Sequence, residues 1–352
     1  MSVRDLVRFF EARKADSEGL VLATVFDTLG STYSKAGDRM LIAGNGDFQG
    51  MLSGGCLEGD LAERAIQVAE TGNAQSVTYD LRESDEDLWG LGVGCEGLMR
   101  IFLQRLEADE AHEPFPSLVD CLLGESPGEL LTIIESSVSG IEPGAAMLRR
   151  VKDEQTFGIA AHALAPLRQE FERLGETGGA AVGQVEVDGE AASYIYAPLL
   201  PAKRILVLGG GLDAEPVVRM LSELGWRVFV QDHRPAYIDK GDFSDAESVS
   251  CVPADELSDL VDLARFDAAI CMSHHLVSDK SYLRQLAETP VPYIGLLGPV
   301  NRRNRLMEEL GTLAERLEGR LHGPAGLDIG GRGPAAIALS IVAQMHQELV
   351  RG

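Results

Sequence analysis

The chain has 352 residues, of which 45% are hydrophobic and 24% charged, as in folded globular proteins long enough for two domains. Its 55 acidic and 31 basic side chains give a net charge of −24 at pH 7, which disfavours binding to nucleic acid or to an anionic membrane surface. Every apolar stretch is shorter than the roughly 18 residues that a membrane span needs, and the charged, amphipathic N-terminal segment is unlike a signal peptide. We therefore expect a cytoplasmic protein.

The first segment, residues 1–106, has the pattern of a mixed helix and strand fold. It opens with an amphipathic helix, and short strands then follow, with a hairpin signal at Gly44-Asn45-Gly46. The predicted strands are LVLATVFDT (20–28), RMLIA (39–43), FQGML (48–52), SVTYDL (76–81) and LMRIFLQRL (98–106).

A helix is expected to begin at or beside Cys56, because apolar residues recur every three or four positions from Leu57 onwards. Gly54 and Gly55 precede the cysteine and remove side-chain bulk on that side. A helix N-terminus favours a thiolate over a thiol through its free N–H groups and its dipole. Cys56 is thus a candidate reactive thiol, and the alternative is a cysteine that packs as a small hydrophobe behind a tight turn.

Cys95 also stands in a glycine-rich turn, so the two thiols are candidates for one shared site. Hydroxyl groups and exposed turn N–H groups suit a polar, anionic heterocycle, and a nearby arginine would balance its charge. The candidate site of this segment comprises Ser31, Thr32, Arg39, Ser53, Gly54, Gly55, Cys56, Glu58 and Cys95. Cys121, Cys251 and Cys271 lie in apolar runs and are expected to be packing residues. All five cysteines are expected to be free, and the absence of C-x-x-C and HExxH motifs gives a zinc site little support.

Residues 107–200 carry a weaker pattern. Strand composition is found in ELLTIIESSV (129–138), GAAMLRRV (144–151) and ASYIYAPLL (192–200), and a helix with a glycine stop is found in EFERLGETGG (170–179). This region either extends the sheet of the first segment or forms a small domain of its own, and the sequence leaves both alternatives open.

Residues 201–352 alternate strands and helices, which is typical of a doubly wound parallel sheet. The predicted elements include a first strand and helix, a second strand ending in Asp232, a helix over 255–266, a strand over 267–275, a helix over 278–289, a strand over 291–299 and a helix over 300–311. The expected fold class is therefore α/β, with a Rossmann-like domain at 201–352 and an N-terminal α+β domain at 1–200.

Gly209 and Gly211 belong to a G-x-G-x-x-A pattern that lies between a predicted strand and a predicted helix. Asp232 ends the next strand, where a dinucleotide site holds a ribose hydroxyl. Asp213 and Glu215, however, place two carboxylates in the first turn of the helix, where they would repel a phosphate. The alternatives are a site for NAD(P) or another nucleotide, or a turn that only closes a strand–helix unit.

Arg302, Arg303 and Arg305 follow a predicted strand at the edge of the sheet where open α/β proteins bind ligands. They are either an anion clamp or a solvated positive face. His274 and His275 end another predicted strand at the same edge, where either could hydrogen-bond a ligand, although two histidines alone are weak support for a metal.

Six ordered blocks of the chain resemble the XdhC/CoxI family of maturation factors for xanthine dehydrogenase, carbon monoxide dehydrogenase and related molybdenum hydroxylases. These blocks are GSTYSKAGDRMLI with GMLSGGCLEGDLAERA, then LGVGCEG, LVLGGGLDAEPV, CMSHHLVSD, YIGLLGPVNRRNRLMEEL and GLDIGGRGPAAIALSIVAQM.

The resemblance implies a chaperone, rather than a turnover enzyme, that binds molybdenum cofactor (molybdopterin). Such a chaperone assists sulfuration of the cofactor with a cysteine desulfurase and delivers it to an apo-enzyme. It assigns cofactor handling and metal ligation to Cys56, which Glu58 follows as expected. The second family cysteine stands in a Gly-Cys-Gly-Gly turn, whereas here Glu96 follows Cys95. Molybdenum accepts soft thiolate sulfur, so Cys56 either ligates the metal transiently, which suits a delivery protein, or relays a persulfide sulfur to it.

Two other functions remain open at this point. One is an NAD(P)-dependent oxidoreductase built on the Rossmann-like half, with a catalytic acid near His274. The other is a non-catalytic regulatory scaffold that uses this half only to dimerise. A homodimer is expected on general grounds of symmetry.

Overall fold

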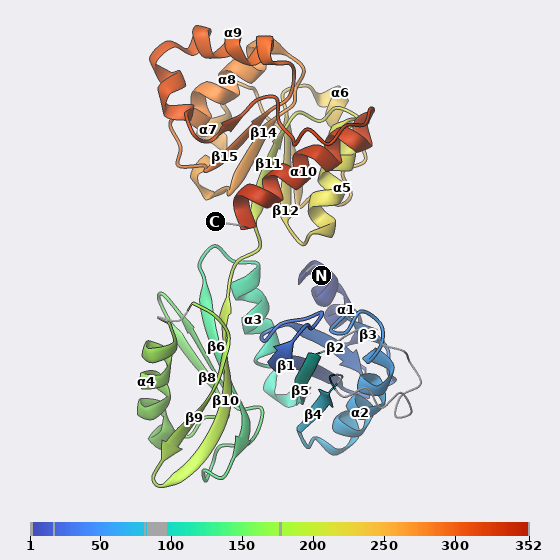
Figure 1. Cartoon of the computed structure of the whole chain (residues 1–352), viewed down its shortest axis with the longest axis vertical. Helices are drawn as coiled ribbons and strands as arrows, with labels where there is room; N and C mark the ends of the chain where they lie inside the picture. The colour runs from blue at the N-terminus through green and yellow to red at the C-terminus, as the bar shows by residue number, and fades with distance from the viewer. Residues whose placement is uncertain (1–2, 17, 81, 83–96, 176–177, 351–352) are drawn as a thin grey trace. The chain divides into compact units, whose positions relative to one another are not determined.

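The computed structural model describes residues 3–16, 18–80, 82, 97–175 and 178–350 (Figure 1). The chain divides into two compact units, the first ending at Pro201 and the second beginning at Ala202. Within the described ranges, every helix is too short or too polar to pass through a lipid bilayer.

The first unit contains an antiparallel sheet with the strand order β3-β2-β1-β5-β4. Its strands are β1 (Leu20–Gly30), β2 (Arg39–Ala43), β3 (Phe48–Gln49), β4 (Gln75–Asp80) and β5 (Gly97–Leu106). Helix α2 (Glu58–Thr71) covers one face, where Met40 and Ile42 of β2 join its apolar side chains. Leu41 and Ala43 point to the other face and pack with α1 (Val3–Arg13) and α3 (Phe115–Leu122). β2 thus separates two apolar clusters by the alternation of its side chains.

Residues 107–200 build a second antiparallel sheet inside the same unit, with the order β8-β7-β6-β10-β9 (Figure 1). Its strands are β6 (Gly128–Ser136), β7 (Ala146–Arg150), β8 (Glu154–Phe157), β9 (Ala181–Val187) and β10 (Glu190–Leu199). Helix α4 (Leu164–Gly175) covers one face of this sheet. The other face meets the first sheet through a cluster that contains Phe26, Phe102, Ile134 and Ile195. The region therefore does not extend the first sheet; it forms a separate sheet within the same compact unit.

The second unit is a Rossmann-like domain, as predicted: a six-stranded parallel sheet with the order β13-β12-β11-β14-β15-β16. Its strands are β11 (Arg204–Leu208), β12 (Arg227–Asp232), β13 (Ser248–Cys251), β14 (Ala268–Cys271), β15 (Tyr293–Leu296) and β16 (Leu321–His322). Helices α5 (Ala214–Glu223) and α10 (Pro334–Val350) pack on one face of the sheet. Helices α8 (Leu276–Ala287) and α9 (Val300–Leu310) pack on the other. The short helices are α6 (Pro235–Ile238) and α7 (Leu257–Leu260).

Three details of the sequence interpretation are wrong. The helix expected over 255–266 is only α7 and a separate 3-10 turn, because Val261 is extended and the Asp262 side chain accepts a hydrogen bond from Ala264 N–H to start a new turn. The strand expected over 267–275 ends at Cys271, so both histidines lie in the following loop. Cys251 is exposed at the end of the edge strand β13, whereas Cys121 and Cys271 are buried as predicted.

Candidate functional site

The Cys56 loop (residues 52–57) is held from beneath by the carboxylate of Glu58, the first residue of α2, which is only 3% exposed. Its Oε1 accepts hydrogen bonds from the backbone N–H groups of Leu52 (2.9 Å) and Ser53 (2.8 Å). Its Oε2 accepts from the N–H of Gly55 (3.0 Å) and from the Ser53 hydroxyl. The loop backbone therefore wraps around a single internal acceptor.

These hydrogen bonds also fix the protonation state of that acceptor. Burial by itself would raise the pKa of the Glu58 carboxyl, but the hydrogen bonds from Ser53 and Leu52 outweigh burial and hold the pKa below its usual range. An ionised carboxylate only accepts hydrogen bonds. The structure thus places Glu58, which the sequence analysis included in the candidate site, in the position of a loop anchor.

Cys56 lies on the outer side of this loop and is exposed. Helix α2 begins at Glu58, close to the expected start. Gly54 (φ +80°) and Gly55 (φ +107°) both adopt left-handed backbone conformations that glycine tolerates best. A Cβ atom added at Gly54 would lie 3.4 Å from the Tyr33 ring, whereas one added at Gly55 would meet nothing within 4 Å. The space before the thiol is therefore bounded by an aromatic ring on one side and open on the other.

The segment 31–34 runs along the Cys56 loop. The Ser34 hydroxyl donates to the backbone oxygen of Met51 (3.5 Å), and the Thr32 hydroxyl donates to the backbone oxygen of Ser34 (2.8 Å). Tyr33 and Met51 are 63% and 47% exposed, so an aromatic and a thioether side chain flank the loop. The structure thus brings Tyr33 and Ser34 of this segment, which Ser31 and Thr32 precede, to the loop that holds the predicted site residues Ser53, Gly54, Gly55, Cys56 and Glu58.

Cys95, the second candidate thiol, lies outside the described residues. The first residue of β5 can still be located relative to the site. A Cβ at Gly97 would lie 2.4 Å from the backbone oxygen of Ser31 and 2.6 Å from Cγ2 of Thr32. The described part of the chain on this side therefore begins in contact with the segment 31–34.

Arg39 is on the other face of the sheet. It pairs with Thr24 at the start of β2, and the next residue, Met40, packs in the α2 cluster. Since successive strand residues point to opposite faces, Arg39 points away from α2 and the Cys56 loop. Burial lowers the pKa of Arg39 to about 10, against the opposing effect of Asp38, and its Nε atom has no hydrogen-bond partner among the described residues. The structure does not place Arg39 where it would balance a charge beside Cys56.

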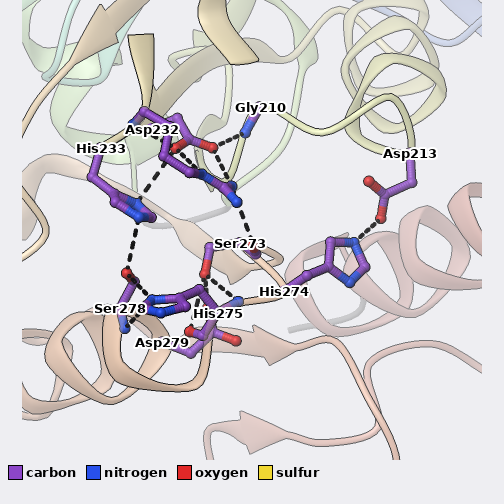
Figure 2. A network of polar contacts seen from close by, with 10 residues as sticks. Gly210, Asp213, Asp232, His233, Ser273, His274, His275, Ser278 and Asp279 are labelled. Carbon is purple, nitrogen blue, oxygen red and sulfur yellow. Dashed lines mark hydrogen bonds and ion pairs between the residues drawn. The ribbon is translucent and has the colours of Figure 1, made fainter. Parts of the chain in front are cut away.

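In the second unit, the strand order reverses between β11 and β14, which is the point where open α/β sheets bind ligands. Figure 2 shows the polar network that surrounds this point. The loops that follow the two strands touch each other, because a Cβ at Gly209 would lie 2.6 Å from the carbonyl carbon of Met272. A hydrogen bond joins the same loops, with Nε2 of His274 lying 2.7 Å from Oδ2 of Asp213 (Figure 2).

Asp232 is fully buried, and both of its oxygens are occupied by the protein itself. Oδ2 accepts from the N–H of Gly210 (2.7 Å) and from Arg234 Nη2 (2.8 Å), while Oδ1 accepts from the N–H (2.9 Å) and Nε (2.9 Å) of Arg234. Burial would raise the pKa of Asp232, but the hydrogen bonds from Arg234 and Gly210 outweigh it and lower the pKa. The same Arg234 donates to the backbone oxygen of Ser273 (3.0 Å), which ties the ends of β12 and β14 together.

The sequence interpretation missed a second group of polar residues beside His275. The Ser278 hydroxyl lies 2.9 Å from His275 Nδ1 and 3.2 Å from His233 Nε2 (Figure 2). Burial, opposed by Asp232, lowers the pKa of His233, which leaves its imidazole neutral at pH 7. The sequence feature that could have identified these residues is their position, since His233 directly follows a predicted strand and Ser278 begins a predicted helix.

The arginines proposed as an anion clamp are each paired within the protein. Nη2 of Arg302 donates to the buried Asp279 (2.6 Å), which also accepts from the Ser273 hydroxyl. Nη1 of Arg303 donates to a backbone oxygen, that of Gly323 (3.2 Å). Arg305 pairs with Glu309 (2.9 Å) on the surface of α9. Their guanidinium groups therefore already have partners within the protein, so their positive charge is only partly available to an anionic ligand.

The described residues contain no group of three His, Cys, Asp or Glu side chains that could hold a metal ion. A surface depression of about 530 Å³ lies along the C-terminal half of α8, lined by residues that include Leu263, Arg284, Gln285, Glu288 and Thr289. It contains none of the candidate residues, so the chemistry of the two glycine-rich turns is the better guide to function.

The chain has extensive matches to known proteins. Residues 14–80 match the XdhC and CoxI family, and residues 205–345 match the XdhC Rossmann domain. A Bacillus subtilis (strain 168) protein named as a probable xanthine dehydrogenase subunit is 31% identical over 96% of this chain and 95% of its own length. The Escherichia coli (strain K12) molybdenum cofactor insertion chaperone PaoD is 20% identical over 98% of this chain and 90% of its own length.

A solved structure shares the architecture. The crystal structure described as a xanthine dehydrogenase from Bacillus halodurans superposes with a TM-score of 0.77 at 27% identity, covering 100% of this chain and 96% of that one. The resemblance inferred from the sequence blocks is thereby confirmed, and the chain belongs to the XdhC and CoxI family.

Proposed function

We propose that this chain is a maturation factor for a molybdenum hydroxylase of the xanthine dehydrogenase type. In this proposal it retains molybdenum cofactor at the Cys56 loop, presents the cofactor to a cysteine desulfurase for sulfuration, and delivers it to the apo-enzyme. Membership of the XdhC and CoxI family supports this function, as does the similarity to a protein named as a molybdenum cofactor insertion chaperone. In this proposal the chain also forms a homodimer.

The single observation that carries the proposal is the exposure of Cys56 on a rigidly anchored loop. Molybdenum held by a dithiolene and oxo groups has affinity for soft thiolate sulfur. Gly55 leaves open space beside the thiol, so a bulky guest can approach it, while the exposed Tyr33 ring offers a flat surface at the edge of that space.

In this arrangement Glu58 keeps the loop in shape and takes no part in proton transfer. Its carboxylate is buried, ionised and directed at the loop backbone, so it has neither the proton nor the access that a general acid needs. The reactive group of the loop is therefore the sulfur alone. Any contribution of Cys95 remains a prediction.

The test is retention of cofactor by purified protein. Wild type, Cys56→Ser and Cys251→Ser are incubated anaerobically with molybdenum cofactor, passed through a desalting column, and analysed for molybdenum and for the fluorescence of the oxidised pterin. Cys251 is the matched control because it is also exposed but lies in the second unit. Wild type and Cys251→Ser should retain the cofactor equally, and Cys56→Ser should retain about tenfold less.

Equal retention by Cys56→Ser would contradict the proposed site. A second assay follows the activation of an apo-hydroxylase by the loaded protein. Full activation by the Cys56→Ser variant would favour the scaffold hypothesis over cofactor delivery.

A further inference from the structure

The glycine-rich turn after β11 has the sequence pattern of a site for a dinucleotide such as NAD(P). In a dinucleotide site, the glycines of this turn let the backbone approach a pyrophosphate, the helix N-terminus faces the phosphate charge, and an acidic residue at the end of the next strand binds the ribose. Each of these features can be compared with the contacts of this chain.

Both glycines of the pattern make room for the protein itself. A Cβ at Gly209 would lie 2.6 Å from the backbone of Met272 and 2.7 Å from the N atom of Ser273. A Cβ at Gly211 would lie 2.6 Å from Oδ1 of Asp213. The first glycine is thus required by the contact between the backbones of two loops, whereas the atom nearest to the second glycine is the end of the Asp213 side chain, which lies over the turn.

Three backbone N–H donors of the turn are also used by the protein. The N–H of Gly209 donates to the backbone oxygen of Gln231 (2.8 Å), and the N–H of Gly210 donates to Asp232 (2.7 Å). The N–H of Ala214 donates to the backbone oxygen of Gly211 (2.8 Å). These three amides are therefore not available to a pyrophosphate.

The electrostatics point in the same direction. Asp213 is the N-cap residue of α5, but its side chain makes no capping hydrogen bond. Its carboxylate is directed over Gly211 towards His274, so a negative charge already stands beside the turn, at the end of the helix dipole that favours anions. Glu215 adds a second carboxylate in the first helical turn.

His274 is held in an uncommon conformation to make this contact. Its φ is +57°, in the left-handed region that only a few per cent of residues other than glycine adopt. Strained backbone of this kind persists where the surroundings determine it. The ribose side is closed too, because the fully buried Asp232 is saturated by Arg234 and Gly210.

We propose that the Asp213 carboxylate is a built-in occupant of the glycine-rich turn, and that the Asp213–His274 pair closes the crevice between β11 and β14 against phosphate-bearing ligands. The wild-type chain accordingly does not bind NAD(P). This inference concerns the second unit alone and is independent of the function proposed for Cys56.

The test is a titration of the full chain with inorganic pyrophosphate, followed by calorimetry, and with NADH and NADPH, followed by fluorescence. The variant Asp213→Ser removes the carboxylate and leaves a good N-cap residue. His274→Asn removes the imidazole that contacts Asp213 but tolerates the left-handed backbone. Asp239→Ser is the control for loss of one negative charge, because Asp239 is exposed and lies outside the turn.

Wild type and Asp239→Ser should show no saturable binding up to about 1 mM of any of the three probes, whereas Asp213→Ser should bind pyrophosphate at least about tenfold more tightly than wild type. His274→Asn should fall between wild type and Asp213→Ser. Saturable binding of NADH or NADPH by wild type would overturn the proposal. So would a folded Asp213→Ser protein, with an unchanged circular dichroism spectrum, that gains no affinity for pyrophosphate.

Discussion

Glu58 and Asp232 are both buried carboxylates that accept a backbone N–H from a glycine-rich turn, yet the two turns differ in what they expose. In the Cys56 loop the carboxylate lies inside, and the outer side presents a thiol next to open space. In the turn after β11, Asp232 again lies inside, but a second carboxylate, that of Asp213, covers Gly211 from outside.

The comparison shows what a glycine pattern does and does not establish. Glycine indicates that the backbone adopts a left-handed conformation or passes close to another group. At Gly55 the space remains empty, whereas at Gly209 and Gly211 the neighbouring group belongs to the protein. The function of such a turn therefore depends on the side chains that follow the glycines.

The largest loss of stability is expected when the buried carboxylate of the second unit, that of Asp232, is removed. Asp232→Asn should destabilise that unit by about 3 kcal/mol, because the half-buried Arg234 guanidinium loses its charged partner. Hydrogen exchange of the β11 and β12 amides reports the local loss of stability. Asp239→Asn, at an exposed aspartate, should leave exchange unchanged; equal effects of the two substitutions would show that the buried pair is not special.

The matching change in the first unit is Glu58→Gln, which should cost about 2 kcal/mol because one backbone N–H and one hydroxyl lose their acceptor in a buried site. Urea unfolding measures the loss, and Glu63→Gln, on the exposed side of α2, is the control. A cost for Glu58→Gln no greater than for Glu63→Gln would contradict the anchoring role.

The same carboxylate also predicts a pH dependence. The pKa of Glu58 is lower in the folded protein than its ordinary value of 4.5, so its stabilising effect is complete above that value and is lost as the pH falls through the folded pKa. Wild type should therefore lose more stability than Glu58→Gln as the pH is lowered below about 4.5. Parallel acid-unfolding curves for the two proteins would contradict this prediction.

A smaller effect separates the left-handed glycines from an ordinary one. Gly54→Ala should destabilise the protein by about 1–2 kcal/mol, because alanine disfavours a φ of +80°; its Cβ itself would make only an ordinary contact with the Tyr33 ring. Gly59→Ala, in the first turn of α2 with nothing within 4 Å of the added Cβ, should instead stabilise it by about 0.5 kcal/mol. Thermal unfolding distinguishes the two signs, and a shift in the same direction for both would argue against the loop geometry.

The smallest effect on stability is expected at the thiol itself. Cys56→Ser should change the free energy of unfolding by less than about 0.5 kcal/mol, because the side chain is exposed. In an alkylation time course followed by mass spectrometry, Cys56 and Cys251 should react in the folded protein. Burial raises the pKa of Cys121 and of Cys271, and both should react only after unfolding. A Cys56 that does not react in the folded protein would contradict the exposed position of its thiol beside open space.

The sequence predicted those elements whose apolar pattern is long and regular. β1, β2, β11 and β12 lie where alternating or continuous apolar runs occur. The strands β8 and β9 escaped prediction because they are edge strands whose residues are mostly exposed or half-buried. The broken helix over 255–266 shows the same limit, since a local side-chain cap at Asp262 overrode an apolar periodicity.

The site divides in a similar way. Ser53, Gly54, Gly55 and Cys56 are adjacent in sequence, so their proximity was certain. The position of Arg39 depended on strand parity, and a shift of one residue exchanges the two faces of a sheet. The contact between Asp213 and His274 joins residues on two different loops of the parallel sheet, so no local sequence pattern predicts it.

The inward direction of the Cys56 loop amides has a consequence for hand-over. Because the N–H groups of Leu52, Ser53 and Gly55 all donate to Glu58, these three groups are not offered to a guest, and in the proposed role the Cys56 sulfur makes the main contact. In the proposed role, departure of the cargo then requires exchange of one metal–sulfur contact and no refolding of the loop. An apo-enzyme with more hydrogen-bond donors for the cofactor would bind it more tightly and so take it over by competition. The Cys56 loop would then be able to bind another cofactor molecule at once.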